Sequence, residues 1–95
     1  PGPPSRVAEA IARVHGEFEA IHPFRDGNGR VGRLIAELMS LQAGCLPPMF
    51  DDSPKGRDRY LKAVGATFGR DYRFLREVVL EAILRAEARV REGWA

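Results

Sequence analysis

The stretch on which the whole chain turns is residues 22–33, which read HPFRDGNGRVGR. Pro23 ends any helix before it, because the residue that precedes a proline is pushed out of the α region. Gly27, Asn28 and Gly29 form the strongest turn signal in the sequence. Apolar residues with helical spacing lie on both sides, so the stretch predicts a loop that joins two helices.

Working outward from this loop, apolar residues recur at steps of three and four, the pattern typical of amphipathic helices. Four such stretches are present: Val7, Ile11, Val14, Phe18 and Ile21; Val31, Leu34, Ile35, Leu38 and Met39; Tyr60, Leu61, Val64 and Phe68; and Phe74, Leu75, Val78, Val79, Ile83 and Ala86. Ser5, Ser53 and Asp71 are the expected N-caps of the first, third and fourth helices. Gly44 is the expected end of the second. No period-two alternation is found, so the sequence predicts an all-α bundle of about four helices.

Composition sets limits on the class of protein. The 95 residues are 44% apolar and 29% charged, which indicates one globular domain over residues 1–95. No apolar run is long enough for a membrane span, so no membrane partner is expected. A single cysteine excludes an internal disulfide and favours the cytoplasm. The net charge of +2 is too small for a general nucleic-acid surface, and glutamates interrupt the arginines of the last helix.

The loop and the helix after it suit a polyphosphate. A helix N-terminus has unsatisfied backbone N–H groups and the positive end of the helix dipole, which together attract anions. Gly27 and Gly29 would let backbone amides approach a phosphate closely, with Asn28 between them. Arg30 and Arg33 are three residues apart, so we expect both to project from one face and reach a polyphosphate at the helix tip.

Two further residues of this loop have chemically reactive side chains. Asp26 precedes the glycines, where its carboxylate could hold Mg²⁺ together with phosphate oxygens. His22 is the nearby group that is able to be neutral at pH 7 and to accept a proton. Singly, such residues are more often a helix cap, a turn residue or a solvated side chain. Their joint occurrence within one loop favours a nucleotide-polyphosphate site with a general base beside it.

Two other interpretations of this segment are weaker. Residues 27–32 match the dinucleotide fingerprint G-x-G-x-x-G, and Asp51 lies about twenty residues on. That site needs a strand before the turn, whereas the preceding residues have helical periodicity. A zinc site built from His15, His22 and Asp26 has neither the spacing nor a cysteine pair to support it.

Residues His22 to Arg33 resemble the signature of the Fic family, H-P-F-x-[DE]-G-N-G-R-x-x-R, at every fixed position. Residues 15–21 are similar to the end of the helix that delivers this motif, and residues 31–48 to the next helix and its proline-containing exit. The resemblance covers residues 7 to about 68 well. It implies a helical Fic-like core.

The resemblance implies transfer of AMP from ATP to a Tyr, Thr or Ser hydroxyl of a target protein, with Mg²⁺ and release of pyrophosphate. Carried over by position, His22 would deprotonate the attacking hydroxyl, Asp26 would bind Mg²⁺, and Phe24 would anchor the loop. The implied phosphate-binding residues are Gly27, Asn28, Gly29, Arg30 and Arg33. A relative with Lys in place of Gly29 phosphorylates its target, so Gly29 favours nucleotidyl transfer.

The chain also departs from the family pattern. Members usually carry further helices and a β-hairpin flap upstream that docks the target, and we expect both to be absent here. Such a piece would bind ATP–Mg²⁺ weakly, modify targets poorly and expose apolar surface that a second copy could cover. A non-catalytic nucleotide- or protein-binding remnant is therefore the alternative. The inhibitory pattern [ST]-x-x-x-E-[GN] is only partly matched, by Ser5 to Glu9 and by Glu92-Gly93. A cytoplasmic, bacterial protein is expected.

Overall fold

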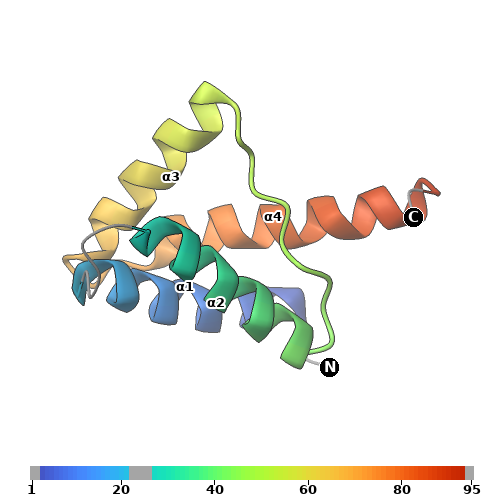
Figure 1. Cartoon of the computed structure of the whole chain (residues 1–95), viewed down its shortest axis with the longest axis horizontal. Coiled ribbons are helices and arrows are strands. Elements are labelled where there is room, and N and C mark those ends of the chain that lie inside the picture. Colours follow the sequence, from blue (N-terminus) through green and yellow to red (C-terminus); the bar gives the residue numbers. More distant parts are fainter. Residues whose placement is uncertain (1–2, 22–26, 94–95) are drawn as a thin grey trace.

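The computed structural model describes residues 3–21 and 27–93 (Figure 1). The described residues form four helices and no strand, which confirms the all-α prediction. The helices are α1 (Pro4–Ile21), α2 (Asn28–Gln42), α3 (Pro54–Thr67) and α4 (Arg73–Arg91). None of them is both long and apolar enough to cross a membrane.

Helix α1 is the centre of the arrangement. It packs against each of the other three helices, and most extensively against α4. Helix α2 runs antiparallel to α1 and, among the described helices, packs on α1 alone (Figure 1). The segment 43–53 then leads from α2 to α3, and the Met49 N–H donates to the carbonyl of Ala82 on α4 at 2.9 Å. Because α2 runs antiparallel to α1, the start of α2 lies near the end of α1 (Figure 1). It also lies beside α3, where the Arg33 guanidinium is close to the Tyr60 ring.

The core lies mainly between α1 and α4. Its largest fully buried apolar side chains include Ile11 of α1 and Leu75 and Ile83 of α4. The predicted face of α1 is partly wrong, because Val14 is 40% exposed and Ile21 is 73% exposed. Val7 and Ile11 are buried as predicted, and the other buried positions are small or polar: Ala8, Ala12, His15 and Gly16. Small side chains let neighbouring helices approach α1 closely, and this contact decides which face is buried.

Helix α2 and the region of α3 also expose apolar residues that the periodicity predicts to be buried. Leu34 and Leu38 of α2 are about half exposed, and Leu41, which the predicted stripe does not include, is exposed to the same degree. Leu61 of α3 and Phe68, its C-cap, are more than half exposed. Among the described helices α2 packs on α1 alone, so its other side is left uncovered by them.

The predicted N-caps differ in their outcomes. Ser53 caps α3 as predicted, because its hydroxyl oxygen accepts from the Gly56 N–H at 3.1 Å. Asp71 lies one residue too early, since Tyr72 is the N-cap of α4. Its carboxylate still accepts from the Arg73 N–H at 3.2 Å and so serves the helix start.

Backbone hydrogen bonds and backbone conformation determine where α1 begins and where α2 ends. Ser5 is not the cap of α1, because the helix begins at Pro4 and the carbonyl of Pro3 accepts the first amide bonds. Proline is favoured in this position because it has no N–H to leave unsatisfied. Gly44 ends α2 as predicted, in the left-handed region at φ 80°.

The end of α3 lies against α1 at a glycine. A Cβ on Gly16 would lie 2.7 Å from the Cβ of Thr67, closer than real side chains approach. Gly16 therefore permits close packing of α1 against the end of α3.

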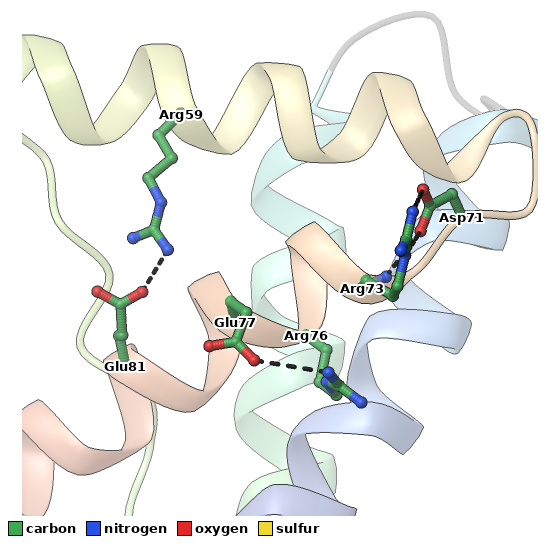
Figure 2. Close-up of polar contacts among 6 residues, drawn as sticks. All are labelled: Arg59, Asp71, Arg73, Arg76, Glu77 and Glu81. Atoms are coloured by element: carbon green, nitrogen blue, oxygen red, sulfur yellow. Dashed lines mark hydrogen bonds and ion pairs between the residues drawn. The ribbon is translucent and has the colours of Figure 1, made fainter.

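Surface ion pairs join α3 to α4 and order the start of α4. Figure 2 shows Arg59 of α3 directed at Glu81 of α4, and Arg73 forked onto Asp71. The Arg73 guanidinium lowers the pKa of Asp71 to about 2. Exposed pairs of this kind contribute little to stability, so the buried contacts hold the fold.

Candidate functional site

The catalytic part of the predicted site lies outside the described residues. His22, Phe24 and Asp26 belong to the segment 22–26, so their roles stay predictions. The first turns of α2, directly after this segment, belong to the described part of the chain. Within the described residues, no group of three or more His, Cys, Asp or Glu side chains could hold a metal ion.

The tip of α2 is built by Gly27. This residue is the N-cap and lies in the left-handed region, at φ 82° and ψ 8°. Its carbonyl accepts from the Val31 N–H at 3.0 Å, which closes the first helical turn. The amides before Val31 have no partner within the helix, and glycine has no side chain to cap them. The first turn also carries no acidic residue, so the positive end of the helix is not neutralised from within.

Arg30 lies at this tip. Its Nη2 atom is 3.2 Å from the place that a Cβ on Gly27 would take, so the guanidinium folds back over the glycine. Gly29 is exposed, and no atom lies within 4 Å of a Cβ built on it. The structure therefore brings Gly27, Gly29 and Arg30 together around an open helix end. An anion at this end would meet both amides and a cation.

Arg33 lies in a different environment. Its side chain is half-buried, and its guanidinium carbon is 5.8 Å from the ring centre of Tyr60 on α3. Arg33 also lines a cavity of about 100 Å³ between α3 and α4. Both arginines lie in the first turns of α2, but Arg33 has a contact with α3 that spacing alone did not indicate.

A buried polar group lies directly behind these turns. His15 of α1 is only 2% exposed. Its Nδ1 lies 3.0 Å from the carbonyl oxygen of Gly32, and its Nε2 lies 2.5 Å from the hydroxyl of Tyr60. A carbonyl can only accept, so Nδ1 carries the hydrogen and the neutral Nε2 accepts from Tyr60.

The electrostatics agree with this assignment. Burial lowers the pKa of His15, which favours the neutral imidazole. Burial also raises the pKa of Tyr60 to about 12, so its hydroxyl keeps its proton at ordinary pH. Glu19 lies beside the pair, with Oε1 3.8 Å from Nε2 of His15. Among the described residues, this buried oxygen has no hydrogen-bond partner.

The sequence interpretation missed His15 and Tyr60 as parts of one site. His15 had been considered only as a zinc ligand, and Tyr60 only as a member of an apolar stripe. A signal existed for the first: His15 lies four residues after Ile11, which places a polar ring on the buried face of α1. No local signal pairs it with Tyr60, because 45 residues separate the two.

Comparison with known proteins provides independent evidence about this chain. The profile of the Fic/DOC family matches residues 3–40, which span α1, the loop and most of α2. A protein of Aquifex aeolicus named "Probable protein adenylyltransferase" is 42% identical over 50 residues. These residues are 53% of this chain but 14% of that relative, so the match spans about one seventh of its length. No solved structure matches the chain.

Proposed function

We propose that the chain is part of a protein adenylyltransferase of the Fic/DOC family, because the model of that family matches residues 3–40. The reaction would transfer AMP from ATP to a Ser, Thr or Tyr hydroxyl of a target protein and release pyrophosphate. One observation carries the proposal: the intact motif of residues 22–33 runs into a helix tip that glycine leaves open to an anion. A single cysteine suits a cytoplasmic setting for this activity.

The described residues would bind the triphosphate. The amides after Gly27, which have no partner within the helix, would meet one phosphate at the tip of α2 together with the folded-back guanidinium of Arg30. Arg33 would neutralise charge further along the triphosphate. Asp26 would hold Mg²⁺, and a single carboxylate suits an ion that takes most of its other ligands from phosphates and water. Bound there, the ion would neutralise negative charge that develops on the leaving pyrophosphate.

His22 would move the proton. The target hydroxyl oxygen forms a bond to the α-phosphorus while the bond from that phosphorus to the bridging oxygen of the β-phosphate breaks. The hydroxyl proton passes to the His22 imidazole, and the electron pair of the broken bond leaves with pyrophosphate. Positioning and charge stabilisation supply most of the acceleration in such transfers.

The test uses the full-length protein that contains this chain, with ATP labelled at the α- or the γ-phosphate. We expect label from the α-phosphate to appear on protein, and label from the γ-phosphate to appear only in pyrophosphate. His22→Ala should lower the rate by roughly 10²–10⁴-fold. Its affinity for ATP should stay close to that of the wild type, because the base acts on the nucleophile.

The alternative outcomes are distinct. Transfer of γ-label would indicate a kinase, and ATP binding without any transfer would indicate the non-catalytic binding module. A His22→Ala variant with wild-type turnover would contradict the role of His22.

A further inference from the structure

Four residues form a closed network of contacts at the start of α2, which we call the circuit: His15, Gly32, Arg33 and Tyr60. His15 holds the carbonyl of Gly32, Tyr60 holds the other nitrogen of His15, and the Tyr60 ring lies by the Arg33 guanidinium. Gly32 and Arg33 are consecutive, so the circuit returns to its starting point. It joins α1, α2 and α3 through one backbone carbonyl and three side chains.

The circuit depends on a close approach between α1 and α2. A Cβ on Gly32 would lie 2.9 Å from Cε1 of His15 and 2.6 Å from Oε1 of Glu19. Glycine at this position therefore leaves the space that the imidazole occupies. The result is a first turn of α2 that a buried hydrogen bond fixes against α1.

The circuit includes a contact between α3 and α2. Helices α1 and α3 pack together, and α1 and α2 pack together, but α2 and α3 form no packed pair within the described residues. The Tyr60 ring is a contact by which α3 can affect the position of Arg33. Phe50 also packs edge-on against that ring, at 6.2 Å between centres. Tyr60 is therefore in contact with both His15 and Phe50.

We propose that Tyr60 and His15 are positioning residues that hold Arg33 ready for a triphosphate at the tip of α2. This rests on the proposed function, in which Arg33 binds phosphate. A free arginine side chain has many rotamers, and ordering it on binding costs free energy. The Tyr60 ring by the guanidinium, and the backbone of Gly32 that His15 fixes next to Arg33 in the chain, remove part of that cost in advance.

The test separates the ring of Tyr60 from its hydroxyl. Tyr60→Leu removes the ring, and we expect the KM for ATP to rise roughly 2- to 30-fold, the range of a cation–π contact. The kcat should change less than the KM, since His22 and the target hydroxyl are untouched. Tyr60→Phe keeps the ring and should restore the KM, although loss of the hydroxyl should lower the melting temperature. His15 is buried and its replacement costs stability, so Tyr60 carries the test.

Two controls complete the experiment on the full-length protein. Phe74→Leu removes a half-exposed ring of α4 that lies outside the circuit, so its KM for ATP should stay at the wild-type value. In an Arg33→Ala background, Tyr60→Leu should raise the KM no further. Thermal unfolding of each variant checks that it is folded.

The outcomes distinguish the two proposals. An active wild type whose Tyr60→Leu variant keeps its KM, or whose Tyr60 effect persists without Arg33, would overturn the positioning role alone. A wild type that transfers no AMP from ATP to protein would overturn the proposed function and the positioning role together.

Discussion

His15 places an imidazole where water hardly reaches, 2% exposed between three helices. Such a ring is stable when both nitrogens have partners, and here a carbonyl and a hydroxyl provide them. The neutral form satisfies both partners. A proton on Nε2 would reverse the bond with Tyr60 and bring a charge into a desolvated site.

The buried imidazole of His15 makes the stability of the fold depend on pH. Burial lowers the pKa of His15; the Gly32 carbonyl and Glu19 oppose this shift, and Arg33 adds to it. Because the unfolded imidazole has a pKa of about 6.5, the unfolded chain takes up the proton first as the pH falls. The contribution of His15 is therefore complete above about pH 6.5 and is lost below it, by at most about 1.4 kcal/mol per pH unit.

Urea unfolding between pH 8 and pH 5 checks this prediction, above the range in which most carboxylates titrate. His15→Gln should be less stable at pH 8 but should lose less stability on acidification than the wild type. His22 is present in both proteins and cancels in the comparison. Equal slopes for the two proteins would show that His15 does not titrate in the way its burial implies.

At the level of single residues, only part of the candidate site can be predicted from the sequence. The motif indicates phosphate chemistry through residue types alone, and the structure places Gly27 and Arg30 together at the N-terminal tip of α2. The support of Arg33 by Tyr60 could not be predicted. It depends on how α3 returns to α1, and a separation of 27 residues between Arg33 and Tyr60 leaves no local pattern.

At the scale of elements, periodicity predicted where helices form better than it predicted which side is buried. All four helices are present, and Ser53 and Gly44 mark limits of α3 and α2 as expected. The face of α1 differs because a helical stripe about 100° wide can rotate toward whichever neighbours pack on it. Ala12 and Gly16 admit close neighbours, and Val14 is left outside.

The close contact between α1 and α3 at Gly16 can be tested by substitution. Gly16→Ala should lower the free energy of unfolding by about 1–3 kcal/mol, because the new methyl group has no room beside Thr67. Gly65→Ala is the matched control, since it lies in α3 with open space around its Cα. It should raise the free energy by about 0.4–1 kcal/mol, through helix propensity and a less flexible unfolded chain.

Chemical denaturation of the three proteins measures both effects. Similar m-values would show that the native and unfolded states are otherwise alike. If both substitutions stabilised the chain equally, α1 and α3 would be further apart in solution than the structure places them.

Across the whole molecule, α1 and α4 form the centre and α2 lies at the edge. Helix α2 packs on α1 alone among the described helices, and its Leu34, Leu38 and Leu41 face outward. The element that would carry the proposed phosphate site is thus the one with the fewest neighbours among the described helices. Regions with few buried contacts open at lower free energy than the core.

Native-state hydrogen exchange should show this difference. We expect the amides of α2 beyond its first turn to exchange through a local opening, at a lower free energy than those around Ile11 and Leu75. A denaturant series would separate the two classes by the slope of exchange against denaturant. One shared isotherm for α2 and α4 would mean that α2 opens only when the entire fold does.

The pairing of α1 with α4 has a consequence for the synthesis of the protein. About fifty residues separate the end of α1 from the start of α4, and a ribosome adds roughly 5–20 residues each second. For about 3 to 10 seconds, the newly made α1 therefore exists without the helix that covers Ile11 and its neighbouring alanines. During that interval its apolar side is open to chaperones and to other nascent chains, and only the arrival of Leu75 and Ile83 closes it.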